Sequence, residues 1–205
     1  MQVEVIFSII VLIMSVVIHE VSHGAVAGLL GDPTARLAGR LTLNPIKHLD
    51  PVGSVILPFI LSLIPGGVVF GWAKPVPYNP YNLRGGQWGP GIVAAAGPAS
   101  NLLLAIIFSV VLRLGAGTFL SPLAVQFVAG IVFINLILMF FNLVPVPPLD
   151  GSKILFSLLP YRFRWIENSL NQFSLPLIIL VIFGIGGVIY PLTLLLFRLL
   201  TGLGL

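Results

Sequence analysis

The first apolar stretch of this chain, and the one that decides its fold, is VEVIFSIIVLIMSVVIHEVSHGAVAGLL over residues 3–30. As a helix rising about 1.5 Å per residue, it is longer than the roughly 30 Å hydrocarbon core of a bilayer. The following Gly31-Asp32-Pro33 is a sequence that ends a helix. Because the stretch has no basic region before it and leads into His19-Glu20 instead of a small-residue cleavage site, we expect a membrane helix and not a signal peptide.

Composition extends this expectation to the whole chain. Of its 205 residues, 58% are hydrophobic and only 8% are charged, whereas soluble domains have about 25% charged residues. So many apolar side chains must face lipid, and we predict an all-α polytopic membrane protein of about four to six transmembrane segments in a single domain, residues 1–205. The absence of cysteine excludes thiolate metal sites. We attribute the net charge of +4 to membrane loops and not to nucleic-acid binding. The sequence gives no sign of the oligomeric state.

The remaining apolar stretches fit a spanning helix unequally. Residues 91–114 and 122–143 fit one throughout, whereas residues 52–70 contain prolines and glycines that break helices, so we expect them to re-enter the membrane. Residues 71–86 are rich in Pro, Tyr, Asn and Gly, which favours either an extended, β-like loop with an edge for substrate or an interfacial loop anchored by aromatic rings. Together they predict a re-entrant, β-like loop near residues 52–86.

The end of the chain is expected to contain shorter helices. A helix is predicted over residues 152–159, with Asp150 near its N-cap. The last apolar stretch, residues 174–203, should be kinked or split by its glycines and Pro191.

Basic residues predict the orientation of the chain. With the N-terminus outside and residues 52–70 re-entrant, only Arg113 and Arg198 lie outside. The other eight basic residues then lie in the cytosol, as the positive-inside rule requires: Arg36, Arg40, Lys47, Lys74, Arg84, Lys153, Arg162 and Arg164. If residues 52–70 span instead, every later segment reverses. We therefore predict a multi-pass protein of the cell membrane with its active site toward the cytosol.

The first helix contains an HExxH motif, His19-Glu20-Val21-Ser22-His23. Residues four apart share one helix face, so both imidazoles can bind one metal ion. Glu20 lies beside them, where it can take a proton from water. The alternative interpretation is a solvated polar helix end, but ionisable groups in apolar helices are costly and normally functional.

A catalytic zinc site usually has a third protein ligand and one open position. The extended pattern HExxHxxGxxH fails, because position 26 is Val and position 29 is Leu. Four other residues remain as candidates: Asp32, His48, Asp50 and Asp150. We favour Asp150, which follows the predicted helix over residues 122–143. If one complete span separates that helix from the first helix, the helix ends on the same side of the membrane as His23. Its alternative role is a plain helix N-cap.

These motifs resemble those of the site-2 proteases, which are intramembrane zinc metalloproteases. The resemblance rests on HEVSH at 19–23 and FNLVPVPPLDG at 141–151. Further stretches look like the compact bacterial and archaeal members: GPASN at 97–101, RLTLNPIKHLDPVGS at 40–54 and GWAKPVP at 71–77. It implies that His19, His23 and Asp150 bind one Zn²⁺ ion. It also implies that Glu20 is the general base and that Asn142 helps to bind the substrate or its oxyanion.

Two asparagines in these motifs have competing interpretations. The amide of Asn142, close to the metal, would donate a hydrogen bond to the developing oxyanion. Alternatively it forms an interhelical hydrogen bond. Asn101, which follows Gly97 and Ala99, is interpreted as part of a tightly packed helix interface.

The predicted activity is hydrolysis of peptide bonds in transmembrane-segment substrates by a metal-activated water, which makes the chain a zinc metalloendopeptidase. A membrane metal-ion transporter is one alternative, although transporters usually show repeated halves. Another is an inactive member of the same fold that binds membrane proteins, although Glu20 is present. A protease for lipidated C-terminal peptides would need a glutamate ligand, and only Glu167 would serve.

Overall fold

The computed structural model describes residues 2–203 except 57–58, 61–72 and 185. Over these residues the chain forms helices joined by turns, with no strand, which confirms the predicted all-α class. The α-helices are α1 (Gln2–Leu29), α2 (Thr34–Leu37), α4 (Gly89–Gly115), α5 (Pro122–Asn142), α6 (Asp150–Leu158), α7 (Arg164–Gln172), α8 (Ser174–Gly184) and α9 (Gly186–Thr201). Short 3-10 turns cover Pro45–His48, Pro80–Asn82, Gly86–Trp88 and Tyr161–Phe163, and a π-helical turn covers Pro51–Ile56.

Three helices are long and apolar enough to cross a membrane, namely α1, α5 and α4 with the turn before it. The last apolar stretch is divided, as predicted, into α8 with 11 residues and α9 with 16. Each is shorter than the roughly 20 residues of a full span. Most of the predicted re-entrant stretch, residues 52–70, lies outside the described residues. The protein is therefore a multi-pass membrane protein, with three full-length spans among the residues described.

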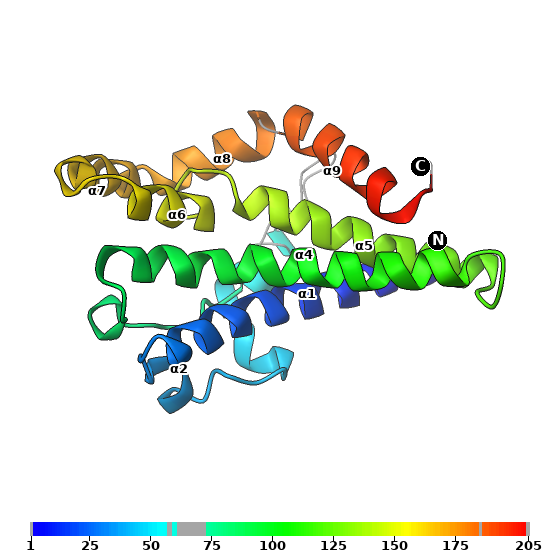
Figure 1. Ribbon diagram of the computed structural model, residues 1–205, viewed down its shortest axis with the longest axis horizontal. Coiled ribbons are helices and arrows are strands. Elements are labelled where there is room, and N and C mark those ends of the chain that lie inside the picture. The colour runs from blue at the N-terminus through cyan, green and yellow to red at the C-terminus, as the bar shows by residue number, and fades with distance from the viewer. Residues whose placement is uncertain (1, 57–58, 61–72, 185, 204–205) are drawn as a thin grey trace.

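Helix α4 is the central element, and it contacts α1, α5, α6 and α9. Both α1 and α5 run antiparallel to α4, so they end at the same end of the molecule (Figure 1). Helices α2, α6 and α7 lie at this end, while the α4–α5 connection lies at the other. This arrangement brings the second half of α1 and the start of α6 to one end of α4.

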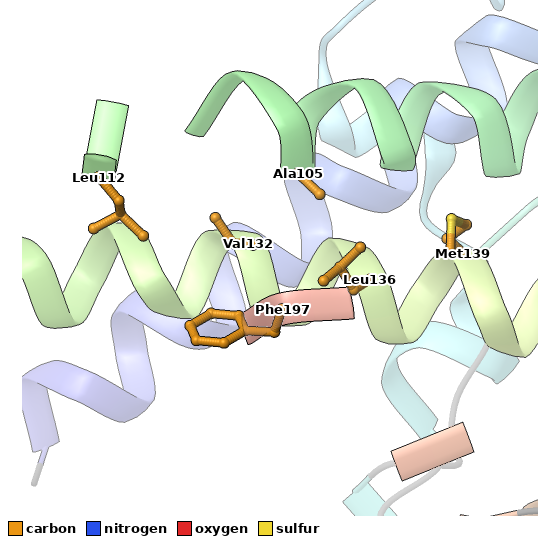
Figure 2. Packing of buried hydrophobic residues seen from close by; sticks show 6 residues of the cluster. All are labelled: Ala105, Leu112, Val132, Leu136, Met139 and Phe197. Carbon is orange, nitrogen blue, oxygen red and sulfur yellow. The ribbon is translucent and has the colours of Figure 1, made fainter. Parts of the chain in front are cut away.

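The apolar core lies along α4, α5 and α9. Leu112 and Ala105 of α4 face Val132 and Leu136 of α5, and Phe197 of α9 belongs to the same buried cluster (Figure 2). These side chains are fully buried, although most of the surface of the three spans is apolar and exposed. Such exposed apolar side chains are suited to contact with lipid.

Glycines allow neighbouring helices to approach α4 closely. A Cβ atom at Gly91 would lie 2.6 Å from the side chain of Ser157 in α6. A Cβ atom at Gly97 would meet the imidazoles of His19 and His23 on α1. Small residues therefore set how near α1 and α6 come to the same stretch of α4.

Within the predicted β-like loop, residues 73–79 form neither helix nor strand. Pro75 and Pro77 lack the N–H groups that a ladder needs. The segment is instead held by separate hydrogen bonds, from the backbone N–H of Lys74 to the oxygen of His48 at 2.8 Å and from Arg40 to the oxygen of Lys74 at 2.7 Å. The segment 73–79 therefore has no regular secondary structure and no partner strand among the described residues.

Candidate metal centre

Three side chains far apart in the sequence converge where α1 meets α6. Nε2 of His19 lies 3.0 Å from Oδ2 of Asp150, and Nε2 of His23 lies 3.2 Å from the same oxygen. The two imidazole rings stand nearly perpendicular, with their centroids 4.7 Å apart. All three residues are buried, and they form the one possible metal-ligand group found in the described part of the chain.

Close contact between the end of α5 and the start of α6 positions Asp150. Gly151 lies directly against the backbone of Leu143, where a Cβ atom would collide. Asp150 is the first residue of α6, and the N-cap position belongs to Leu149. The carboxylate does not act as the predicted cap, because it faces the two imidazoles.

The other ring nitrogen of each histidine faces an oxygen that can only accept a hydrogen bond. Nδ1 of His19 lies 2.6 Å from Oδ1 of Asn101, and Nδ1 of His23 lies 2.7 Å from the carbonyl oxygen of Val93. Both Nδ1 atoms must therefore carry the proton. When the two rings are neutral, their Nε2 atoms present lone pairs toward the Asp150 carboxylate. Three acceptors facing one another need a cation between them.

The donor set fits zinc. Two imidazole nitrogens and a carboxylate oxygen are zinc ligands, with bonds of about 2.0–2.2 Å. A tetrahedral ion with such bonds separates its ligand atoms by about 3.3–3.4 Å. The observed separations of 3.0 Å and 3.2 Å are close to that value. Anchored second nitrogens are also typical of histidines that bind metal.

Glu20 borders the same site without joining the ligand group. It is half-buried, and its Oε2 accepts a 2.8 Å hydrogen bond from the backbone N–H of Val76 in the segment 73–79. A cavity of about 130 Å³ lies among Glu20, the two histidines and Asp150. The carboxylate therefore borders the same cavity as the three candidate ligands, and a backbone donor holds one of its oxygens.

Asn142, the last residue of α5, lines the same cavity. Its Nδ2 donates a hydrogen bond to the carbonyl oxygen of Leu138 at 2.9 Å, within its own helix. The alternative of an interhelical bond is thus not what the structure shows. One amide hydrogen remains for a group within the cavity.

The other candidate ligands have different partners. Asp50 accepts from the backbone of Val52 and Gly53 and so caps the π-helical turn. His48 bonds the carbonyl oxygen of Thr42. Asp32 accepts hydrogen bonds from Thr34, Asn79 and Asn82, which hold its pKa below the ordinary value although burial opposes the charge. Glu167 borders a separate, larger cavity.

Sequence reasoning missed the role of Asn101. It was expected only to pack helices, but it contacts His19 directly and is completely buried. Asn135 of α5, which no motif singled out, bonds Asn101 in turn. The available signal was polarity, since an asparagine within an apolar spanning helix is costly unless it has a partner.

Comparison with known proteins identifies the family. Peptidase family M50 matches over residues 117–185, which include Asn142 and Asp150. The "Putative zinc metalloprotease YwhC" of Bacillus subtilis is 42% identical over 164 residues, covering 77% of this chain and 71% of that protein. The chain belongs to peptidase family M50. This M50 chain is also 34% identical over 143 residues to the "Putative zinc metalloprotease Rip2" of Mycolicibacterium smegmatis.

That second match covers 68% of the present M50 chain and 52% of Rip2, so the chain spans about half of that relative. No solved structure matches. Family membership agrees with the resemblance drawn from the motifs and makes the chain a metalloprotease with zinc as its cofactor. The relatives' names give no support to the metal-ion transporter alternative.

Proposed function

We propose that this M50 chain is an intramembrane zinc metalloendopeptidase that hydrolyses peptide bonds in transmembrane-segment substrates. His19, His23 and Asp150 would hold the ion, Glu20 would act as general base and Asn142 would bind the oxyanion. The observation that carries the proposal is the convergence of the two Nε2 atoms on Oδ2 of Asp150, with Glu20 bordering the same cavity.

Each residue has a task that its surroundings support. A zinc ion held there would supply Lewis acidity and make a water molecule nucleophilic near neutral pH. Glu20 accepts the proton of that water and passes it to the leaving amine. Its bond from the Val76 N–H leaves the other carboxylate oxygen free for this transfer. The remaining hydrogen of the Asn142 amide donates to the oxygen of the scissile carbonyl as charge develops on it.

The dimensions of the site indicate the form of the substrate. The cavity of about 130 Å³ is too small for a folded helix, whose diameter with side chains is about 10–12 Å. A transmembrane substrate must therefore unwind so that an extended peptide reaches Glu20 and the ligands. The segment 73–79 borders the cavity through Pro75, Val76 and Tyr78 and is neither helix nor strand. It is placed to align an unwound chain beside the reacting groups.

A wider space adjoins the site on the side of α6 and α7. A second cavity of about 940 Å³ is bordered by Tyr78 and Lys153, which also border the small cavity. Nζ of Lys153 lies 5.6 Å from the centre of the Tyr78 ring. This larger space offers a route for water and for the polar flank of a substrate. We place it on the cytosolic side because the basic residues of α2, α6 and α7 lie at this end.

The test is zinc analysis together with cleavage of a generic transmembrane substrate by the purified chain in detergent. The proposal expects about one zinc per chain and cleavage within the substrate's apolar segment. Glu20→Gln should keep the zinc and lower the cleavage rate by about 10²–10⁴-fold, since it removes only the base. Cleavage at the parental rate by Glu20→Gln would contradict the assignment. A parent that binds zinc and substrate without cleaving it would point to the inactive binding class.

A further inference from the structure

A chain of buried hydrogen bonds extends away from the metal centre across three helices. Nδ2 of Asn101 donates to Oδ1 of Asn135 at 2.9 Å, joining α4 to α5. Nδ2 of Asn135 donates to Oγ of Ser15 on α1 at 3.0 Å and to the carbonyl oxygen of Ile131 at 2.9 Å. Ser15 is one helical turn before His19. We call these three residues, Asn101, Asn135 and Ser15, the asparagine network.

The network is enclosed in the protein interior. Asn101 and Asn135 are 0% exposed and Ser15 is 3% exposed, so water cannot substitute for a missing partner. Every side-chain nitrogen and oxygen of the two asparagines has a partner in the network, in His19 or in the backbone. Since an unsatisfied amide is costly in an apolar interior, the two amides have one favourable orientation.

That orientation reaches the metal centre. Because both hydrogens of the Asn135 amide are used by Ser15 and Ile131, its oxygen must face Asn101. The NH₂ group of Asn101 is then used by Asn135, so its oxygen must face Nδ1 of His19. An oxygen at that place accepts only from a protonated Nδ1, which leaves Nε2 of His19 as the nitrogen without a proton.

We propose that Asn135 is a positioning residue for zinc binding, acting through Asn101 to hold His19 in the tautomer that presents a bare Nε2. Ser15 serves as the acceptor that completes the orientation of Asn135. This inference rests on the proposed assignment of His19 as a zinc ligand. It adds to that assignment a second layer of residues, of which Asn101 and Asn135 are on helices that supply no ligand.

The test compares zinc dissociation constants of full-length variants in detergent. Asn135→Leu frees the Asn101 amide to turn its NH₂ group toward His19, which favours the wrong tautomer. The dissociation constant should rise on the order of tenfold, the low end of the effect of outer-shell partners. Adding Asn101→Asp should restore affinity to about the parental value, because a carboxylate presents an acceptor in either orientation. Thr193→Val, a buried polar-to-apolar change on α9, is the matched control and should bind zinc as the parent does.

This rescue distinguishes a positioning role from a packing role. Asn101→Asp restores an acceptor for His19 but does not repair any packing defect left by Asn135→Leu. Unchanged affinity in folded Asn135→Leu, or a loss that Asn101→Asp fails to restore, would overturn the proposal. If Asn135→Leu does not fold, ¹⁵N spectra of the zinc-loaded parent decide: a proton on Nδ1 of His19 supports the network, and a bare Nδ1 overturns it. A parent that binds no zinc would instead refute the metal centre itself, and the network's role with it.

Discussion

The backbone N–H of Val76 donates a 2.8 Å hydrogen bond to Oε2 of Glu20, which ties the segment 73–79 to the proposed general base. A hydrogen bond to a charged group contributes about 1.5–3 kcal/mol. The segment that would align the substrate thus also orients the carboxylate that would activate water. In the proposed mechanism, one peptide group would couple substrate alignment to the position of the base.

Removing that peptide N–H should impair catalysis without removing the metal. In Val76→Pro the donor is lost, so Glu20 is no longer held and turnover should fall by about tenfold or more. The matched control is Val76→Ala, which loses more side-chain packing but keeps the N–H, and it should retain most of the activity. Cleavage rates are compared at equal zinc content. Greater loss in the alanine variant than in the proline variant would show that packing, and not the hydrogen bond, matters.

Adding one methyl group to α4 should disturb both histidines. A Cβ atom at Gly97 would lie 2.6 Å from Cε1 of His23 and nearer still to His19, so Gly97→Ala must displace the rings. Overpacking typically costs about 1–3 kcal/mol, and we expect zinc affinity to fall about tenfold or more. Gly130→Ala in α5 has nothing within 4 Å of its added methyl group and should bind zinc normally. Equal zinc affinities in the two variants would refute the close contact.

Asn142→Ala tests the oxyanion role. Its amide borders the cavity and has one uncommitted hydrogen, so its removal should lower turnover by about 10²–10³-fold while zinc content and melting temperature stay near the parental values. Turnover and melting temperature are measured on the same preparation. An unchanged rate with a lower melting temperature would mean that Asn142 only stabilises the end of α5.

The orientation in the membrane can be tested with single cysteines, because the chain has none. Arg36 of α2 and Arg162 are exposed at the end that holds the site, and Thr118 is exposed in the α4–α5 connection. Cysteines at Arg36 and Arg162 should be labelled only from the cytosolic side, and a cysteine at Thr118 only from the opposite side. The reverse pattern, or labelling of Arg36 and Arg162 from different sides, would refute the proposed topology.

Much of this architecture was predictable from local pattern. The length of the apolar stretches predicted α1, α4 and α5, and the glycines near residue 185 predicted the division between α8 and α9. The i, i+4 spacing of His19 and His23 requires only helix geometry. Placing Asp150 with them required one further step. An odd number of complete spans must separate α1 from the helix before Asp150, so that both helices end on the same side of the membrane.

The contacts that the sequence could not predict depend on how each helix is rotated about its axis relative to its neighbours. The contact of Asn101 with His19, and of Asn135 with Asn101, requires three helices in one register, which no spacing within a single helix reveals. The Val76–Glu20 bond likewise joins residues 56 positions apart. The β-like loop predicted near residues 52–86 forms no strand over residues 73–79, because composition does not indicate whether a partner strand exists.

The most direct test of the metal centre is the zinc content of Asp150→Ala beside that of Glu20→Gln, measured on purified chains together with cleavage of a transmembrane substrate. Asp150 supplies the oxygen that both Nε2 atoms face, so its loss should remove both zinc and activity. Glu20→Gln should lose activity only. A full equivalent of zinc in Asp150→Ala, with its loss in His48→Ala, would show that the third ligand is His48 and would contradict the centre described here.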